Sequence, residues 1–344
     1  MIKIEERTRW GHSTILIEEG LLEKAGKVVT KEYPDSRFAI AIDSNLERIY
    51  GFRLKKIFPN SLFLVIPAGE LNKTIQTVTD MAAKLIQGGY TASDILIGFG
   101  GGMVTDMTGF LASIYMRGMH YVAIPTSLMG MVDASIAGKT GVDFIAKNIL
   151  GSIYPARFVM IDPKFLEHFT GQMRIAGMAE VIKYAAIKDT TLFKDLAANK
   201  LNWMTIIKKS IQAKVAITGK DLRESGHRKI LNYGHTFGHA IEAATHYVYT
   251  HDMAVAIGMT LSNLIAQKLG LQKITVGAQI RAVLEKYNLL SDLPPTLRIE
   301  NLIEWLKKDK KRKGNKIAFV VVPKIGQAKL VPMTAEELIK LART

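Results

Sequence analysis

One stretch decides the fold: Ile95-Leu96-Ile97-Gly98-Phe99-Gly100-Gly101-Gly102-Met103-Val104-Thr105-Asp106. It passes from a short apolar run, typical of a buried strand, through three consecutive glycines into a helical pattern. Glycines at such a turn let backbone N–H groups approach a diphosphate, with the positive end of the helix dipole behind them. The glycine spacing is neither that of the G-x-G-x-x-G fingerprint nor that of a P-loop. The turn indicates a phosphate-binding loop, with a tight strand–helix turn that binds nothing as the alternative.

Strand-like and helix-like segments alternate on both sides of this stretch. Helices are predicted at residues 46–58, 73–88 and 103–115. Strands are predicted at residues 14–18, 38–43, 62–67, 95–99, 121–125 and 158–161. Near-continuous apolar strands separated by helices are typical of a mostly parallel sheet that is covered on both faces. We therefore predict a mostly parallel, Rossmann-like α/β domain over residues 1–165.

The pattern after residue 165 is helical. Helices are predicted at residues 176–187, 203–217, 235–244 and 253–269. A β-hairpin is predicted at residues 317–322 and 328–331. We therefore predict a mainly α-helical second domain over residues 166–344.

The composition bounds the class of protein. The 344 residues include no cysteine, which excludes disulfides and suits a reducing compartment. No apolar run reaches the ~18–20 residues of a membrane span, and Met1–Arg7 carries acids where a signal peptide would be apolar. We expect a cytoplasmic protein without a membrane partner. Its 46 basic and 31 acidic residues give a net charge of +15, which favours anionic partners.

Further segments offer groups for an anionic ligand. The stretch Asp133-Ala134-Ser135-Ile136-Ala137-Gly138-Lys139-Thr140-Gly141 follows the strand end Thr126-Ser127 and frames Lys139 with glycines. Lys147-Asn148 comes shortly after and extends the same anion site. Asp43 closes an earlier strand, where a carboxylate commonly meets a ribose hydroxyl. A solvated loop lysine is the alternative for Lys139.

A group of histidines points to a metal. The stretch Asn232-Tyr233-Gly234-His235-Thr236-Phe237-Gly238-His239 opens a helix and places His235 and His239 at i and i+4, on one helical face. His251 and Glu180 lie on neighbouring segments. Two histidines with a carboxylate and an open position describe a catalytic zinc site. Spacing alone selects His235 and His239 and leaves the third ligand open, with helix-capping or hydrogen-bonded histidines as the alternative.

These segments together resemble the dehydroquinate synthases, and the likeness runs through most of the chain. It is carried by Pro67-Ala68-Gly69-Glu70 with Lys73-Thr74, Gly100-Gly101-Gly102 with Asp106, Tyr115-Met116-Arg117-Gly118, Val132-Asp133, Gly138-Lys139-Thr140-Gly141, Ala179-Glu180-Val181-Ile182-Lys183-Tyr184, Leu231–Glu242 and Asp309-Lys310-Lys311. So many motifs in this order make the resemblance specific.

The resemblance implies an activity and its cofactors. It implies an α/β domain that binds NAD and a helical domain that binds zinc, or cobalt, together with the substrate. The implied reaction converts 3-deoxy-D-arabino-heptulosonate 7-phosphate to 3-dehydroquinate and phosphate, a lyase step of the shikimate pathway toward chorismate and the aromatic amino acids. Its steps are transient oxidation by NAD, phosphate elimination, reduction and aldol ring closure. The metal acts there as a Lewis acid and template.

The resemblance also implies roles for single residues. The metal ligands would be Glu180, His235 and His251, which replaces the choice of His239 made from spacing. His239 would instead move a proton beside the phosphate. The substrate's phosphate would be bound by Lys139, Asn148, Asn232, Lys310 and a second subunit's Arg117. Its carboxylate would be bound by Lys214 and Arg228, and its ring hydroxyls by Asp133 and Lys183. The NAD site would comprise Asp43, Glu70, Lys73, Gly100, Gly101, Gly102, Asp106, Thr126, Ser127, Lys139 and Lys147. The role of Arg117 implies a homodimer.

Four places depart from the family's pattern. Thr105 stands where glycine is common, and the loop between Gly141 and Lys147 is one residue short. Asp252-Met253 replaces the Gly-Glu that usually follows the last metal histidine. Residues 168–173 replace a segment that usually carries Leu-Pro and a glutamate. None of these changes removes an implied site residue.

Three other functions stay open. A sugar-phosphate cyclase of the inosose-forming type has the same fold and metal, but its substrate lacks a carboxylate, and such sequences usually lose the equivalents of Arg228 and Asn232. A metal- and NAD-dependent polyol dehydrogenase needs no phosphate clamp. Nucleic-acid binding by the basic run 307–316 is disfavoured, because no aromatic residue interleaves with its lysines. We expect a small phosphorylated and carboxylated sugar as the ligand, and no nucleic acid.

Overall fold

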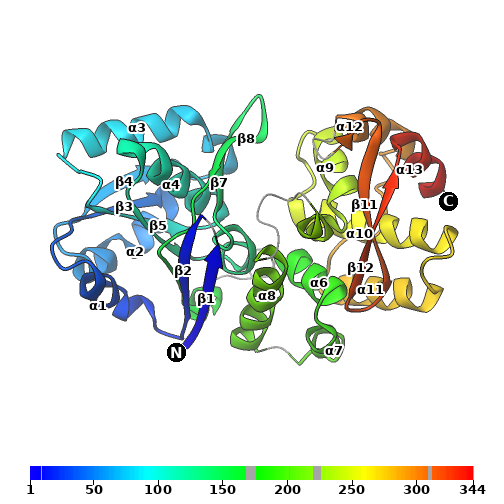
Figure 1. The fold of residues 1–344 in the computed structure, drawn as a ribbon, viewed down its shortest axis with the longest axis horizontal. Helices are drawn as coiled ribbons and strands as arrows, with labels where there is room; N and C mark the ends of the chain where they lie inside the picture. The colour runs from blue at the N-terminus through cyan, green and yellow to red at the C-terminus, as the bar shows by residue number, and fades with distance from the viewer. Residues whose placement is uncertain (9, 168–175, 201, 220–225, 309–311, 344) are drawn as a thin grey trace. The chain divides into compact units, whose positions relative to one another are not determined.

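The computed structural model describes residues 1–8, 10–167, 176–200, 202–219, 226–308 and 312–343. The chain divides into two compact units, Met1–Arg174 and Ile175–Thr344 (Figure 1). From the sequence we placed the boundary a few residues earlier, after residue 165.

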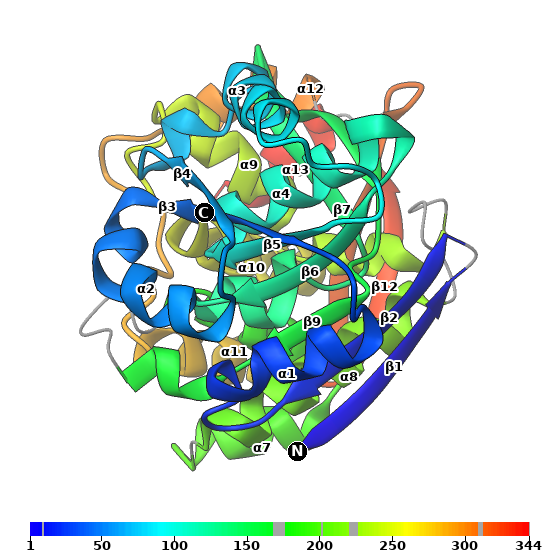
Figure 2. The ribbon, with the colours of Figure 1, turned by 90° about the vertical axis from the view of Figure 1, so that its left-hand side faces the viewer.

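Unit 1 is built on a seven-stranded sheet with the order β1-β2-β9-β6-β5-β3-β4. Only β1 and β2 pair antiparallel, and Figure 2 shows them side by side at one edge. The other neighbours are parallel. The strands of the sheet are β1 (Ile2–Thr8), β2 (Gly11–Ile17), β3 (Phe38–Asp43), β4 (Leu62–Ile66), β5 (Ile95–Gly100), β6 (His120–Pro125) and β9 (Phe158–Ile161). The predicted mostly parallel, Rossmann-like α/β unit is confirmed.

Helices separate these strands because apolar residues recur on one face of each helical segment. The helices are α1 (Leu22–Glu32), α2 (Ser44–Ile57), α3 (Ile75–Gln87) and α4 (Gly102–Ile114). All six residues of β5 are buried, as expected for a parallel strand that is covered on both faces. The helix α1 was not predicted, and neither was β1, whose alternating polar side chains suit an edge strand.

The hairpin of β7 (Lys139–Phe144) and β8 (Ala146–Ile153) was not predicted from the sequence. Two glycines face each other across the hairpin, where a Cβ on Gly141 would lie 2.6 Å from the carbonyl oxygen of Leu150, and one on Gly151 2.4 Å from that of Thr140. These glycines allow two backbones to approach closely, so they mark a strand pair.

Unit 2 is mainly helical, as predicted. Its helices are α6 (Met178–Ile187), α7 (Thr190–Ala197), α8 (Trp203–Thr218), α9 (His235–Ala244), α10 (His251–Lys268), α11 (Ile274–Lys286), α12 (Ile303–Lys307) and α13 (Ala335–Ala342), with the 3-10 turns η5 (His227–Asn232) and η6 (Ile299–Leu302). A small antiparallel sheet accompanies them, with β10 (Arg312–Lys313), β11 (Lys316–Lys324) and β12 (Gln327–Met333). The predicted hairpin corresponds to β11 and β12 (Figure 1).

The core of unit 2 fixes the two helices that carry the histidines. Phe237 of α9 and Ile257 of α10 are fully buried in one apolar cluster, and the ring of Phe237 meets that of Phe319 edge to face with centroids 6.0 Å apart. A Cβ on Gly258 would lie 2.0 Å from the carbonyl oxygen of Gly234. Glycine at position 258 therefore lets α10 touch the turn that leads into α9. No helix among the described residues is long and apolar enough to cross a membrane.

Candidate active site

Three side chains of unit 2 converge to form a candidate metal centre. Glu180 projects from the first turn of α6, and His235 and His251 are the first residues of α9 and α10. The Nε2 atoms of His235 and His251 lie 3.2 Å and 3.5 Å from Oε1 of Glu180. One ligand atom from each residue lies within 4.8 Å of the other two. A single cation placed among them would be reached by all three.

The second ring nitrogen of each histidine is already engaged. Nδ1 of His235 lies 3.2 Å from the backbone oxygen of Tyr233, and Nδ1 of His251 lies 3.4 Å from Oε2 of Glu242. A histidine that donates through Nδ1 presents the lone pair of Nε2, which is the arrangement of histidines that ligate metals. Both rings therefore turn Nε2 toward Glu180.

The electrostatics of the cluster keep the Glu180 carboxylate ionised. Glu180 is almost fully buried, and none of the described residues gives either of its oxygens a well-directed hydrogen bond. Burial opposes its ionisation, but the charge of Lys183, which contacts Oε2, and then His235 outweigh burial and hold the pKa of Glu180 well below its usual value. Burial also tends to lower the pKa of His251, yet Glu180 and Glu242 raise that pKa to about 10.

These residues fit a zinc or cobalt ion. The donor set is two imidazoles and one carboxylate, the set of catalytic zinc sites that keep an open position. The buried carboxylate oxygens without well-directed donors are what such an ion would satisfy. His239 is exposed and lies outside the group, although its ring centroid is 5.4 Å from that of His235. The spacing of His235 and His239 on the helix thus brings their rings close together, but only His235 belongs to the group with Glu180 and His251.

The other implied residues of unit 2 lie on the elements that surround this cluster. Lys183 follows Glu180 by one turn of α6 and is buried. Lys214 on α8 and Arg228 and Asn232 on η5 are buried as well. Cationic side chains are rarely buried without a charged or polar partner. Lys310 lies outside the described residues.

In unit 1 the sheet topology has a switch point, the place where open α/β sheets generally have their binding crevice. The chain passes from β3 to β4 on one side and then returns to β5 on the other side of β3. Ligands of open α/β sheets bind at such a switch point, at the carboxyl ends of the strands. Asp43 ends β3 there, and Gly100 ends β5. The glycine-rich stretch therefore lies where the topology predicts a nucleotide.

The glycine turn packs closely against the start of α4. Gly101 precedes α4 and has no side chain with which to cap the helix. A Cβ on Gly100 would lie 2.7 Å from the side chain of Val104, so glycine is required by packing there. Thr105 is accommodated inside the turn, where its hydroxyl donates to the backbone oxygens of Gly101 and Gly102 at 3.3 Å and 3.0 Å. This departure from the family's pattern therefore consumes no donor of the turn.

The side chain of Asp43 is engaged in capping. Its Oδ1 accepts hydrogen bonds from the backbone N–H groups of Asn45 and Leu46 at 2.9 Å and 3.0 Å. Directly after β6, Thr126 is buried, and the Ser127 hydroxyl accepts from the backbone N–H of Gly130 at 3.2 Å. The side chains of Asp43 and Ser127 thus close the turns that follow β3 and β6.

A buried ion pair lies at the same sheet edge. Nζ of Lys73 donates to Oδ2 of Asp106 and to Oδ1 of Asn148, both at 2.7 Å. Burial raises the pKa of Asp106 to about 6, in spite of Lys73. Glu70 lies 3.9 Å from the same ammonium group but is exposed. Lys73 thereby connects Asp106, which the resemblance assigns to the NAD site, with Asn148, which the resemblance assigns to the substrate's phosphate.

The remaining implied residues of unit 1 are more exposed. Lys139 begins β7 and is exposed, and Lys147 on β8 and Asp133 are half-buried. Arg117 is exposed and has a φ of 69° in the turn after α4.

Glu242 is a residue that we missed from the sequence. It is buried on α9, and it orients His251 as described above. A signal was available, because Glu242 follows His235 by seven residues and so lies on the same face of the helix.

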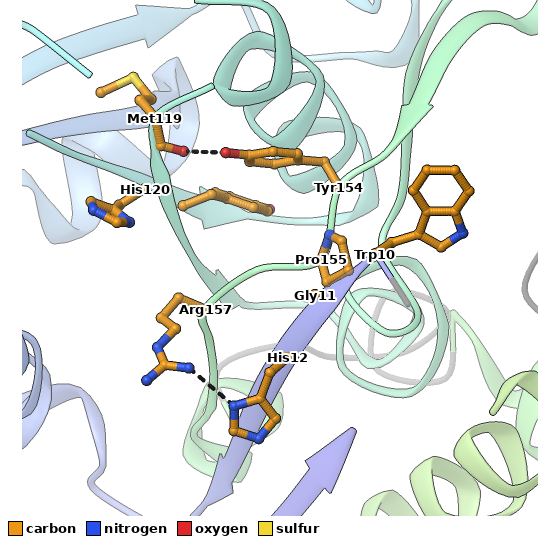
Figure 3. Close-up of a pocket in the computed structure, with 9 residues that line it drawn as sticks. Trp10, Gly11, His12, Met119, His120, Tyr154, Pro155 and Arg157 are labelled. Atoms are coloured by element: carbon orange, nitrogen blue, oxygen red, sulfur yellow. Dashed lines mark hydrogen bonds between the residues drawn. The ribbon is translucent and has the colours of Figure 1, made fainter. Parts of the chain in front are cut away.

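Unit 1 also contains a hollow of about 190 Å³ (Figure 3). Arg157 donates to Nδ1 of His12 at 3.0 Å in its wall, and the Tyr154 hydroxyl donates to the backbone oxygen of Met119 at 2.9 Å. Its lining consists of Trp10, Gly11, His12, Met119, His120, Tyr121, Tyr154, Pro155 and Arg157. None of the implied site residues lines it, so it is separate from the candidate site.

The fold and the site define a class. A Rossmann-like unit with a glycine turn at its switch point, and a helical unit with a Glu–His–His centre, are the parts of a metal-dependent enzyme with a dinucleotide-binding unit. The family models 3-dehydroquinate synthase N-terminal and 3-dehydroquinate synthase C-terminal match residues 63–175 and 177–312.

Comparisons with individual proteins agree with these matches. The chain is 43% identical over 288 residues to the 3-dehydroquinate synthase of Synechocystis sp., covering 80% of each chain. It is 39% identical over 342 residues to that of Rippkaea orientalis, covering 95% of this chain and 93% of the relative. The solved structure of the 2-epi-5-epi-valiolone synthase ValA from Streptomyces hygroscopicus subsp. jinggangensis, with NAD+ and Zn2+ bound, superposes with a TM-score of 0.86 at 26% identity, covering 99% and 98% of the two chains. The chain belongs to the 3-dehydroquinate synthase family.

Proposed function

We propose that this chain is a 3-dehydroquinate synthase that converts 3-deoxy-D-arabino-heptulosonate 7-phosphate to 3-dehydroquinate and phosphate in the shikimate pathway. The observation that carries the proposal is the convergence of Glu180, His235 and His251 in a chain of this family. The identity of 39% to a 3-dehydroquinate synthase over nearly the whole chain supports the same assignment.

The proposed cofactors are NAD and Zn2+, with Co2+ as an alternative metal. The crevice at the ends of β3 and β5 would hold NAD, and Glu180, His235 and His251 would hold the metal. The valiolone synthase binds NAD+ and Zn2+ on a similar fold. When bound, these groups supply reversible hydride acceptance and polarisation of a hydroxyl oxygen.

The chain's own residues would bind and orient the substrate. Lys139, Asn148, Asn232 and Lys310 would hold the phosphate, with a second subunit's Arg117. Lys214 and Arg228 would hold the carboxylate, and Asp133 and Lys183 the ring hydroxyls. His239, exposed beside the metal centre, would carry a proton toward the leaving phosphate. Cationic groups that meet an anion make the strong, charge-assisted class of hydrogen bond.

The assembly and the compartment are part of the proposal. The resemblance to the dehydroquinate synthases gives Arg117 a role toward the substrate of a second subunit, and its side chain is exposed, so we propose a homodimer. The cysteine-free sequence suits the cytoplasm, where we place the reaction.

A comparison of substrates tests the proposal against the inosose-forming alternative. The protein should release phosphate from the heptulosonate phosphate and not from glucose 6-phosphate, which has no carboxylate. Arg228→Ala should lower kcat/KM for the heptulosonate phosphate roughly 10- to 100-fold, because a hydrogen bond between charged groups is worth about 1.5–3 kcal/mol. Arg281→Ala, which removes an exposed arginine on α11, is the control and should leave kcat/KM unchanged. Faster release from glucose 6-phosphate, or full activity in Arg228→Ala, would contradict the assignment.

A further inference from the structure

The helix that carries Glu180 begins without a cap of its own. Its N-cap residue is Gly177, which has a φ of 108° and no side chain to accept a hydrogen bond. The first N–H groups of a helix have no partner within the helix and require an acceptor from elsewhere, above all where they are buried. Met178 and Ala179, which follow, are fully buried.

Asp252 supplies that acceptor from another helix. Its two carboxylate oxygens each lie 2.9 Å from the backbone nitrogen of Gly177, and Oδ1 also accepts from the backbone N–H of Ala179 at 3.1 Å. Asp252 itself is buried at the start of α10. A carboxylate at this end of a helix is also favoured by the helix dipole.

The hydrogen bonds of this cap lie next in sequence to two of the proposed metal ligands. Asp252 directly follows His251, and Ala179, which it binds, directly precedes Glu180. The hydrogen bond between Asp252 and Ala179 therefore links the start of α10 to the start of α6, one residue from His251 and one residue from Glu180. We propose that Asp252 is a positioning residue that sets the distance between Glu180 and His251 and so prepares the metal centre; this inference rests on the proposed function.

The capping residue Asp252 stands at one of the places where this chain departs from the family's pattern. The family's pattern has Gly-Glu where this chain has Asp252-Met253. A glycine at position 252 would offer no carboxylate to Gly177 and Ala179. In this chain the carboxylate of Asp252 therefore supplies the cap of α6.

The experiment is a titration of the metal-free full chain with Co2+, and the visible absorption of the bound ion is the readout. Asp252→Ala should weaken Co2+ binding about tenfold and change the absorption spectrum, because the ligands no longer start from a fixed geometry. Asp252→Asn keeps one acceptor oxygen and should bind within about threefold of the wild type. If Asp252→Ala yields no folded protein, Asp252→Ser carries the same expectation, since its hydroxyl is too short to reach both N–H groups.

The matched control is Asp189→Ala. Asp189 also caps a helix of unit 2, but as the N-cap residue of α7 itself: its Oδ1 accepts from the backbone N–H groups of Thr191 and Leu192 at 2.9 Å, and it is not next to a ligand. It should lower the melting temperature while leaving Co2+ affinity and spectrum unchanged. Equal Co2+ binding by Asp252→Ala and the wild type, or equal loss in Asp252→Ala and Asp189→Ala, would overturn the inference. Failure of the wild type to bind Co2+ would instead overturn the proposed metal site.

Discussion

Replacing His235 with alanine should abolish metal binding and, with it, phosphate release, while the protein stays folded. His235 is one of three residues that face a single point, and two remaining ligands do not hold a catalytic zinc ion firmly. We expect turnover to fall roughly 10³-fold or more, because a Lewis-acid metal lowers the free energy of the charged transition state by several kcal/mol. The fold should survive, since the ring packs at a partly open centre. Bound zinc per chain and the rate of phosphate release measure the effect.

His120→Ala is the control for this variant. His120 is an exposed histidine of unit 1 whose ring stacks on Tyr33 with centroids 4.5 Å apart. It should keep its zinc and its activity. A His235→Ala protein with zinc and near-wild-type turnover would remove the metal centre from the account.

Lys73→Met is the second large effect that we expect, and it concerns unit 1. The substitution removes the ammonium group from Asp106 and Asn148 and leaves a largely buried carboxylate without its cation. The loss of one partner of such a pair costs about 3 kcal/mol. We also expect NAD affinity to fall at least about tenfold, because the pair lies at the edge of the sheet proposed to bind NAD. Denaturant unfolding and an NAD titration measure the two effects separately.

The double variant Lys73→Met/Asp106→Asn separates stability from binding. It removes the uncompensated charge, so it should recover much of the free energy of unfolding. It should not recover NAD affinity. If the single variant is as stable as the wild type, the pair is not the buried partner we describe. If the stability falls while NAD binding is intact, the pair is structural only.

The parallel strands of unit 1 could be predicted because burial on both faces leaves an unmistakable pattern. Phe38–Asp43 and Phe158–Ile161 correspond to β3 and β9 without a shift. The hairpin β7–β8 could not be found, because Gly141 and Gly151 act through a partner strand, and glycine in the sequence alone also signals a loop. Helix starts that depend on a residue elsewhere are likewise invisible: we placed one helix start at 176, whereas α6 begins at Met178 under the cap from Asp252.

The candidate site was harder to read than the fold. Helical spacing identifies residues that share a face, and it selected His235 and His239. It does not reveal that His251 and Glu180, which are far away in the sequence, present their donor atoms to the same point. Those two were obtained from the resemblance to the dehydroquinate synthases. The hydrogen bond between Lys73 and Asn148 was not foreseen, because it depends on the position of β8 relative to the segment that precedes α3.

Phosphate release from the heptulosonate phosphate tests the central claim most directly. The protein is assayed with NAD, before and after removal of metal by a chelator and again after addition of Zn2+, while NADH is followed by its absorbance. We predict release that requires both NAD and metal, returns with Zn2+, and proceeds without accumulation of NADH. Release without either cofactor, accumulation of NADH in step with turnover, or no release by the folded, zinc-loaded protein would contradict the account.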